Sequence, residues 1–330
     1  MRFGILGTAG VGRAAVVPTI QESEHKVAVV GSRDLERVEA YAEDLNIPRA
    51  VGSYEAVLEA DIDAVYIPLP NALHAEWCQR AADAGLDILC EKPIAVDADE
   101  AERLYEHCAG AGVALMEGFM YRHHPRTVRA LEIAREDLST IRSVSTTFSV
   151  SMPTDPEDIR FSPELGGGSL LDVGCYAVHS TRGFLGDPER VHADVLDTRD
   201  CGVDTEVAAL FEYDGTHAHV RFGYDTPMVQ RYRVDAENGW LRAEEAFVCG
   251  PEQSVSIEYH VDGRESTETF EPADHFRLQL EAFAEAVAGG DTPVDAADSV
   301  GNMRTLDAIR ESGVSGIPVE LEQINSGLQP

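Results

Sequence analysis

Residues 2–13 read RFGILGTAGVGR, and this stretch decides the fold of the first part of the chain. The apolar run Phe3–Leu6 has the composition of a buried strand, and a helical pattern begins at Arg13. Between them the spacing G-x-A-x-x-G occupies residues 7–12, a variant of the dinucleotide-binding fingerprint. Its position after a strand and before a helix predicts a turn that binds a pyrophosphate, rather than an ordinary strand–helix turn.

Each part of this loop has a physical reason. Gly7 permits the tight turn, Ala9 and Gly10 let the backbone approach a pyrophosphate, and Gly12 allows close packing of helix on strand. Free N–H groups at the helix start then bind the anion. The loop residues expected to contact the dinucleotide are Gly7, Thr8, Ala9, Val11 and Gly12.

The first 120 residues alternate short apolar runs with amphipathic stretches. The runs are Phe3–Leu6, Val27–Val30, Ala64–Ile67, Ile88–Cys90 and Val113–Met116, with helical patterns near 11–21, 34–45, 72–84 and 97–110. Alternation of fully apolar strands with helices predicts an α/β fold with a doubly wound parallel sheet. We therefore expect a dinucleotide-binding Rossmann domain over residues 1–122.

The pattern changes after this point. Strand-like runs, many of them alternating apolar with polar residues, cover 141–151, 191–200, 205–213, 216–224, 229–236 and 253–260, and helical patterns cover 125–136, 170–185, 275–289 and 295–312. Such alternation is typical of an antiparallel sheet with one face in water. The prediction for residues 123–330 is an α+β domain with a large open, mostly antiparallel sheet.

The charge of the chain excludes several classes of partner. It carries 59 acidic against 26 basic residues, a net charge of −33. This field repels nucleic acid and anionic membranes, so neither is expected as a partner. The six cysteines are scattered without a C-x-x-C pair, and no signal peptide or transmembrane run is evident, so we expect reduced thiols and a cytoplasmic protein.

The end of the second strand sets the choice of cofactor. NAD enzymes place Asp or Glu there to bind the ribose hydroxyls. This chain has Gly31-Ser32-Arg33, in which Gly31 leaves room, Ser32 can donate a hydrogen bond and Arg33 can bind a 2′-phosphate. The sequence predicts NADP, with NAD as a weaker cofactor because Asp34 lies next door. A surface arginine that merely starts a helix is the alternative.

Lysine is almost absent, and one of the two that remain lies in Glu91-Lys92-Pro93; the other is Lys26. Arginine stays protonated at any working pH, whereas the pKa of an ammonium responds to its surroundings. Lys92 is therefore a candidate for proton chemistry, although both lysines could be chance survivors.

Further motifs match a known family in order and spacing over nearly the whole chain. They are Pro70-Asn71-Ala72-Leu73-His74, Glu91-Lys92-Pro93, Met120-Tyr121-Arg122, and the run from Gly166 through Asp172-Val173-Gly174-Cys175-Tyr176-Ala177-Val178-His179. Together with the loop at 7–12 they resemble the family of glucose-fructose oxidoreductases and inositol dehydrogenases. The branch that they resemble most holds sugar 1-dehydrogenases, such as xylose dehydrogenase, and dimeric dihydrodiol dehydrogenase.

The resemblance implies roles for individual residues. It places Lys92 by the nicotinamide, with a cis peptide bond before Pro93. Inositol dehydrogenases carry D-x-G-x-H-x-x-D with histidine as the acid–base, but here Tyr176 occupies the histidine slot and His179 the final aspartate slot. Because other branches use tyrosine at this slot, Tyr176 is expected to be the proton acceptor.

The chemistry supports this assignment independently. Oxidation of an alcohol needs a base for the hydroxyl proton, and a phenol with its ordinary pKa of about 10 is too weak an acid near neutrality. A nearby ammonium such as Lys92 would lower that pKa, and Asp172 could orient the lysine or a sugar hydroxyl. In a helix from about residue 170, Asp172, Tyr176 and His179 would share one face. The alternative is that Tyr176 and His179 are ordinary residues of an amphipathic helix.

Other candidates surround this core. Residues expected to contact the cofactor beside the loop are Ser32, Arg33, Leu69, Pro70, Asn71, His74, Glu91 and Lys92. Residues expected to bind the substrate are Lys92, Arg160, Asp172, Tyr176 and His179. The pairs His123-His124 and His217-x-His219 lack the spacing of a metal site, so no metal is expected.

The resemblance implies an NADP-dependent aldose 1-dehydrogenase that acts on a D-xylose- or glucose-type sugar. Alternatives are an oxidoreductase acting on a cyclic diol or a keto-sugar, and a non-catalytic sugar or nucleotide sensor. An NAD-recycling glycosidase is disfavoured by Arg33. A homodimer or homotetramer formed through the second-domain sheet is expected, as in other family members.

The acidic surface generates a prediction about salt. Self-repulsion of the charges destabilises the compact state, and at about 1 M salt the Debye length falls to about 3 Å, which removes most of this repulsion. We expect the protein to lose structure in dilute buffer and regain it in molar KCl, as in a salt-accumulating cytoplasm. A thermal melt followed by circular dichroism checks this, and a melting temperature indifferent to KCl would contradict it.

Overall fold

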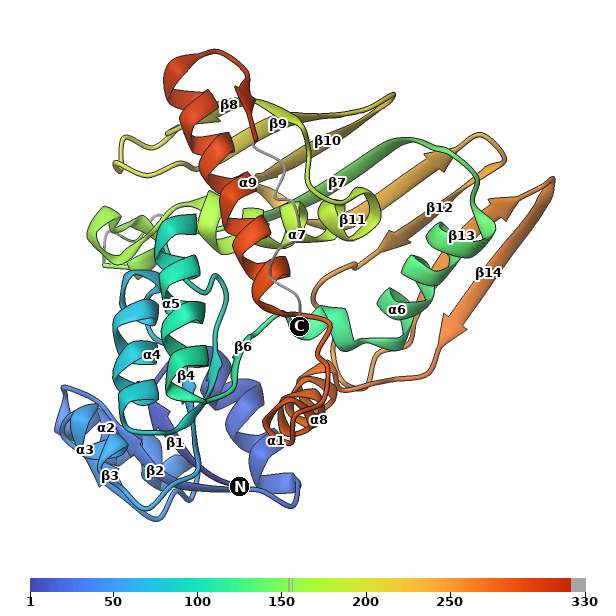
Figure 1. Cartoon of the computed structure of the whole chain (residues 1–330). Helices are drawn as coiled ribbons and strands as arrows, with labels where there is room; N and C mark the ends of the chain where they lie inside the picture. Colours follow the sequence, from blue (N-terminus) through green and yellow to red (C-terminus); the bar gives the residue numbers. More distant parts are fainter. Residues whose placement is uncertain (154, 156, 322–330) are drawn as a thin grey trace. The chain divides into compact units, whose positions relative to one another are not determined.

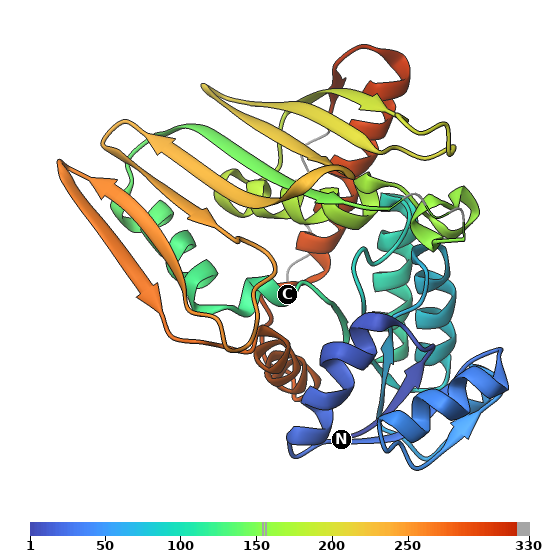
Figure 2. The ribbon, with the colours of Figure 1, turned by 180° about the vertical axis from the view of Figure 1, so that it is seen from behind.

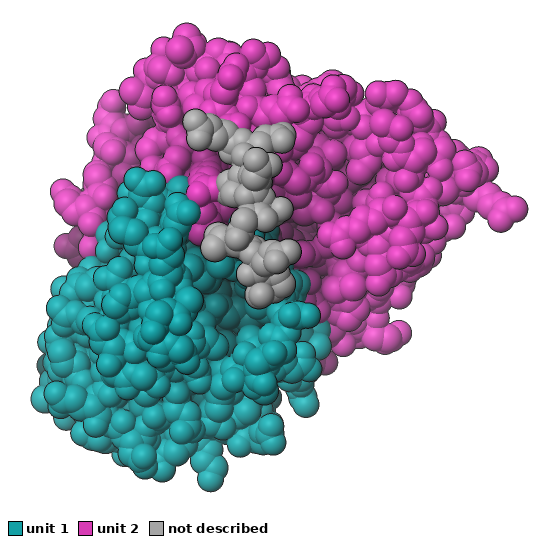
Figure 3. Space-filling model, in the orientation of Figure 1, with its two compact units in different colours: residues 1–120, 275–299 teal, residues 121–274, 300–330 magenta. Residues whose placement is uncertain are grey.

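The computed structural model describes residues 1–153, 155 and 157–321. Contacts divide the chain into two compact units, coloured in Figure 3. Unit 1 contains Met1–Met120 and His275–Ser299, and unit 2 contains Tyr121–Asp274 and the chain from Val300 onward. Among the described residues, no helix has the length and apolar character needed to cross a membrane.

Unit 1 is built on a six-stranded parallel sheet in the order β3-β2-β1-β4-β5-β6 (Figure 1). Its strands are β1 (Arg2–Leu6), β2 (Lys26–Gly31), β3 (Ala50–Val51), β4 (Ala64–Ile67), β5 (Asp87–Cys90) and β6 (Leu115–Glu117). The order reverses between β1 and β4, which creates the switch point where ligands bind in such sheets. The predicted doubly wound Rossmann sheet is confirmed.

Two helices of unit 1, α2 and α5, begin at capping residues. The carboxylates of Asp34 and Asp97 accept hydrogen bonds from backbone N–H groups in the first turns of α2 and α5, and α5 ends at Gly112 in the left-handed conformation. The helical segments are η1 (Gly12–Val16, a π-helical turn), α1 (Val17–Glu22), α2 (Leu35–Asp44), α3 (Glu55–Leu58), η2 (Asn71–Leu73), α4 (His74–Asp83) and α5 (Ala98–Ala111).

A late segment of the chain completes this unit. In α8 (His275–Val287), Leu280 and Phe283 are buried in the same core cluster as Phe3, and the rings of Phe3 and Phe283 are 6.0 Å apart. The compact unit therefore differs from the predicted domain of residues 1–122, because residues 275–299 join it. The apolar face of α8 did not indicate which sheet it would cover.

Unit 2 contains a nine-stranded sheet in the order β14-β13-β12-β11-β7-β10-β9-β8-β15 (Figures 1 and 2). The strands are β7 (Ile141–Ser151), β8 (Arg190–Leu196), β9 (Glu206–Tyr213), β10 (Thr216–Gly223), β11 (Asp225–Ala236), β12 (Gly239–Glu244), β13 (Val255–Val261), β14 (Arg264–Phe270) and β15 (Val319–Glu320). Among these described strands only β7 and β10 pair in parallel, so the prediction of a mostly antiparallel sheet is confirmed.

Helices cover this sheet. The helix α7 (Cys175–Leu185) packs on β7 and β10, and α6 (Pro125–Glu132) packs on β13. The remaining helical segments are η3 (Met120–His123), η4 (Ile133–Asp137), η5 (Ile159–Phe161), η6 (Pro163–Leu165), η7 (Leu170–Gly174) and α9 (Ala296–Ser315), the last of which crosses the boundary between the units in the sequence.

The helix predicted from residue 170 has an irregular first turn. Residues Leu170–Gly174 form the π-helical turn η7, and the regular α-helix begins at Cys175. A Cβ atom at Gly174 would lie 2.6 Å from the ring of Phe222, so this turn lies directly on the sheet. Asp172 therefore lies in the π-helical turn and Tyr176 and His179 lie in the regular helix that continues from it, so the sharing of one face by the three residues stays a prediction.

Candidate active site

The glycine loop of unit 1 has the geometry of a phosphate-binding turn. Gly7 has a φ of +101°, a conformation that glycine adopts without strain, and its N–H donates to the carbonyl of Gly31 at 2.7 Å. A Cβ atom at Gly7 would lie 3.0 Å from Leu69. Around Gly10, by contrast, a Cβ atom would meet no other atom within 4 Å, so the backbone is accessible there.

Gly12 packs against a buried tyrosine. A Cβ atom at this position would lie 2.8 Å from the hydroxyl of Tyr41 and 3.6 Å from Tyr66. The close packing predicted for Gly12 is confirmed. Burial raises the pKa of Tyr41 to about 12, although the guanidinium of Arg13, 4.8 Å above its ring, acts in the opposite direction.

The end of β2 presents two arginines. Arg33 and Arg37 are both exposed, on either side of the start of α2, and neither forms an ion pair with the described residues. The carboxylate of Asp34 is occupied as the cap of α2, where it accepts the N–H of Arg37 at 3.0 Å. Arg37 was not among the residues expected from the sequence, because Arg33 lies before α2 and Arg37 is the third residue of that helix.

The chain is closely packed around Gly31. A Cβ atom there would lie 2.4 Å from Val57 and 2.6 Å from the carbonyl of Ser53. The glycine makes room for packing by the neighbouring segment, and the expectation that it also leaves room for the cofactor stays a prediction. Ser32 is nearly buried, and its hydroxyl lies 3.4 Å from the N–H of Asp34.

The Glu-Lys-Pro segment follows β5, and other strands hold it. The peptide bond between Lys92 and Pro93 is cis, as the resemblance implied. The hydroxyl of Tyr66 donates to Glu91 Oε1 at 2.7 Å, and the buried carboxylate of Glu117 accepts the N–H of Ile94 at 2.9 Å. Burial raises the pKa of Glu91, while the hydrogen bond from Tyr66 and the charge of Lys92 oppose that rise.

His74 also fixes this segment. It is fully buried at the first position of α4, with Nδ1 2.7 Å from the carbonyl of Pro93 and Nε2 2.8 Å from the carbonyl of Leu69. Both ring nitrogens are thus occupied by backbone, and the expected contribution of His74 to cofactor binding stays a prediction. Leu69 and Pro70 lie in the short turn between β4 and η2, and Asn71 is the first residue of η2, which leads into this helix.

The protonation of His74 decides the strength of these contacts. A neutral imidazole has one N–H and donates to one carbonyl, whereas the imidazolium donates to both. Burial lowers the pKa of His74, and the charge of Lys92 lowers it further, while the two carbonyl contacts raise it. The ring therefore couples the turn before α4 to the segment that carries Lys92.

In unit 2, Tyr176 lies in an aromatic cluster. It is 5% exposed, and its ring centroid lies 5.5 Å from that of Phe148, 5.8 Å from that of Tyr121 and 5.8 Å from that of Phe247. One turn later on α7, the buried His179 has its Nδ1 2.6 Å from the hydroxyl of Tyr121. Tyr176 and His179 therefore belong to one packed group, as expected for neighbours on a helix face.

Asp172 anchors a second group of side chains. Its Oδ2 accepts hydrogen bonds from Arg160 Nε and from the hydroxyl of Tyr224, both at 3.2 Å. Arg160 also pairs with Asp158. The structure thus brings together the predicted Asp172 and Arg160 and adds Tyr224, which the sequence did not indicate because it lies about 50 residues further along the chain.

The glycine run before Asp172 is held by another carboxylate. Asp204 accepts the hydroxyl of Ser169 and the N–H of Leu170, both at 2.6 Å, and a Cβ atom at Gly168 would lie 2.3 Å from its Oδ1. Burial raises the pKa of Asp204, and these two hydrogen bonds oppose that rise. The hydroxyl of Tyr224 also donates to the carbonyl of Gly168, at 3.0 Å.

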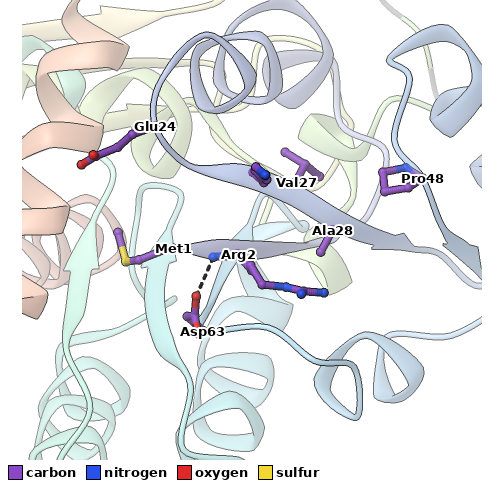
Figure 4. Close-up of a pocket in the computed structure, with 8 residues that line it drawn as sticks. Met1, Arg2, Glu24, Val27, Ala28, Pro48 and Asp63 are labelled. Carbon is purple, nitrogen blue, oxygen red and sulfur yellow. Dashed lines mark hydrogen bonds between the residues drawn. The ribbon is translucent and has the colours of Figure 1, made fainter.

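A hollow of 460 Å³ lies elsewhere on unit 1 (Figure 4). It is lined at the amino ends of the strands by residues that include Arg2, Lys26 and Asp63, and the N–H of Arg2 donates to Asp63 at 2.7 Å. Ligands of doubly wound sheets bind at the carboxyl ends, where the glycine loop and Glu91-Lys92-Pro93 lie. We therefore do not assign the nucleotide to this hollow.

In the described part of the chain, no cluster of three or more His, Cys, Asp or Glu side chains could hold a metal ion.

Comparison with known proteins agrees with this geometry. Residues 1–119 match the family model described as "Oxidoreductase family, NAD-binding Rossmann fold", and residues 126–242 match the GFO/IDH/MocA C-terminal domain. The chain belongs to the GFO/IDH/MocA oxidoreductase family. The resemblance inferred from the motifs is confirmed, and so is the expectation of an oxidoreductase.

Three similar proteins illustrate the range of this GFO/IDH/MocA group. A D-xylose 1-dehydrogenase (NADP(+)) of Haloferax volcanii is 52% identical, covering 98% of this chain and 100% of the relative. A 3-ketoreductase of Actinomadura kijaniata, solved with NADP and TDP-benzene, is 32% identical with a TM-score of 0.88, covering 94% and 97%. An aldose–aldose oxidoreductase of Caulobacter crescentus, complexed with glycerol, is 28% identical with a TM-score of 0.88, covering 97% and 99%.

The contacts of His74 can be tested by changing its ring. His74→Phe keeps a ring of similar size but removes both nitrogen contacts to buried carbonyls. We expect the free energy of unfolding to fall by about 1–3 kcal/mol, the cost of a buried polar group that loses its partner. Denaturant unfolding measures this, with His107→Phe as the control, because His107 is exposed and pairs with Asp83 at the surface. Equal stability of the two variants would contradict the role of His74.

Proposed function

We propose that this protein is an NADP-dependent aldose 1-dehydrogenase that oxidises a pyranose such as D-xylose at its anomeric carbon to give a lactone. The single observation that carries the proposal is the 52% identity over 325 residues with the Haloferax volcanii D-xylose 1-dehydrogenase. The substrate is further supported by the presence of the proton-transfer candidates Lys92 and Tyr176 in the expected motifs.

The residues fit the reaction chemistry. As the C1–H bond breaks and its electron pair leaves with the hydride, the C1 hydroxyl must lose a proton. In this proposal Tyr176 accepts that proton, and the ammonium of Lys92 stabilises the negative charge that develops. The aromatic cluster around Tyr176 excludes water from the ring and fixes its orientation. Asp172, His179 and Arg160 position the sugar hydroxyls.

The cofactor proposal rests on unit 1. The backbone accessible at Gly10 and the positive φ of Gly7 fit a pyrophosphate, and Glu91 and Lys92 lie at the carboxyl end of β5 where a nicotinamide belongs. Bound NADP supplies the hydride acceptor. Two exposed arginines, Arg33 and Arg37, have no ion pair within the described part of the chain, and they fit the two negative charges of a 2′-phosphate better than an NAD ribose.

A second reaction type has a specific observation in its favour. The 3-ketoreductase of Actinomadura kijaniata has the same fold, with a TM-score of 0.88. The name of a curated relative from the same organism describes the reductase of a keto-sugar nucleotide. Reduction of a keto-sugar would use Tyr176 as the proton donor instead of the acceptor, so the same residues serve both directions.

The homo-oligomer formed through the unit 2 sheet and the cytoplasmic location remain part of the proposal.

The arginine pair predicts a cofactor preference. Arg33→Ala and Arg37→Ala remove favourable charge only from a ligand that carries a 2′-phosphate. Each should raise the Michaelis constant for NADP about tenfold or more, the effect of losing a charge-assisted hydrogen bond, and leave that for NAD nearly unchanged. Steady-state kinetics with both cofactors checks this. Equal effects on NADP and NAD would refute the assignment, and Arg49→Ala serves as an exposed control.

The reaction itself is tested by NADP reduction at 340 nm in molar KCl across xylose, glucose, other aldoses, inositol and a cyclic diol. We expect turnover on an aldose and loss of at least 100-fold in kcat in Tyr176→Phe, which lacks the proton acceptor. Cofactor binding should persist in the variant. Turnover on the diol alone, or full activity of Tyr176→Phe, would contradict the proposal.

A further inference from the structure

The aromatic cluster around Tyr176 depends on a segment without regular structure. The segment begins at Glu244, the last residue of β12, and residues 245–248 leave the sheet; Glu245 has a φ of +50°, a conformation unusual for a residue with a side chain. Backbone groups in such a segment need partners from elsewhere when they are buried. Two buried side chains, Arg126 and Gln230, supply them.

Arg126 binds the carbonyl groups at the start of this segment. It is the second residue of α6 and is 1% exposed. Its guanidinium donates to the carbonyls of Glu244 at 3.2 Å, Glu245 at 2.9 Å and Ala246 at 2.7 Å. One planar group therefore satisfies three consecutive carbonyls.

Gln230 binds the rest of the segment from β11. Its Oε1 accepts the N–H groups of Phe247 at 3.0 Å and Val248 at 2.6 Å, and its Nε2 donates to the carbonyl of Val248 at 2.6 Å. Its backbone carbonyl accepts the N–H of Ala246 at 2.9 Å. Gln230 thus supplies residues 246–248 with hydrogen bonds of the kind that a neighbouring strand would provide.

These contacts fix the position of Phe247. The side chain is fully buried, its ring is stacked on Phe148 with centroids 5.1 Å apart, and it meets Tyr121 edge-on at 5.3 Å. The ring of Phe247 lies 5.8 Å from that of Tyr176. Because Phe247 has no exposed surface, it influences the reaction through the rings that it packs against and not by direct contact with a substrate.

We propose that Gln230 and Arg126 are positioning residues that, by holding residues 244–248, seat Phe247 against Tyr176 and keep the proton acceptor in its reactive orientation. This inference rests on the proposed function, in which Tyr176 accepts the proton. Small displacements of a reacting group cost much of its rate, whereas binding of a cofactor in the other unit is unaffected. We therefore expect substitutions of these residues to lower kcat and to leave the Michaelis constant for NADP unchanged.

The test uses three variants of the full chain in molar KCl. Gln230→Met keeps the length of the side chain without its amide, and Phe247→Leu removes the ring directly. Val234→Ala is the matched control, since Val234 is buried on the same strand but makes none of these contacts. Melting temperature, near-ultraviolet circular dichroism, kcat and both Michaelis constants are measured for each, and for the double variant Gln230→Met with Phe247→Leu.

We expect Gln230→Met and Phe247→Leu each to lower kcat at least tenfold with the Michaelis constant for NADP within twofold of the wild type. The double variant should be no more than twofold slower than the worse single variant, because both changes act through one ring. Val234→Ala should lose stability but keep kcat within twofold. If Gln230→Met does not fold, Gln230→Glu replaces it, since a carboxylate retains both acceptor contacts.

Three kinetic results would overturn the inference. These are a kcat for Gln230→Met within twofold of the wild type, an equal loss of kcat in Val234→Ala, or fully multiplicative effects in the double variant. An unchanged near-ultraviolet spectrum of Gln230→Met would also overturn it, whether or not an aldose is oxidised. Full activity of Tyr176→Phe would instead refute the proposed function, so the two failures are distinguishable.

Discussion

A buried backbone N–H or carbonyl group without a partner costs free energy, and this constraint governs the segments that lie beside the candidate functional residues. The segments are irregular and cannot use the hydrogen bonds of a sheet or helix. Buried polar side chains form hydrogen bonds with their backbone groups instead. In unit 1, His74 and Glu117 bind the backbone of Pro93 and Ile94 beside Lys92.

In unit 2, buried polar side chains bind irregular backbone in two places. Asp204 holds the glycine run and the N–H of Leu170 in front of Asp172, while Arg126 and Gln230 hold residues 244–248 behind Tyr176. A π-helical turn, which often marks a functional site, places Asp172 just before α7. The regular elements are therefore a scaffold, and the buried polar residues determine where the reactive side chains lie.

The sequence predicted those features that depend on local pattern. Apolar strands at a steady spacing gave the parallel sheet, and the loop at 7–12 gave the dinucleotide site. Polar strands such as β14 (Arg264–Phe270), with mostly exposed side chains, were missed because they lack a strong apolar alternation. The backbone contacts of His74 could not be predicted, because only the tertiary fold brings its ring to the carbonyl of Pro93, 19 residues away. Arg126 and Gln230 could not be found for the same reason, since their partners lie about 120 and 18 residues along the chain.

The central claim is that a hydride leaves the anomeric carbon of an aldose for NADP. The most direct measurement uses the aldose oxidised by the enzyme with deuterium at C1, followed by mass spectrometry of the reduced cofactor and of the sugar product. The account predicts that the deuterium appears on the nicotinamide and that the sugar product is a lactone without label. Deuterium retained in the sugar product, with unlabelled NADPH, would contradict it.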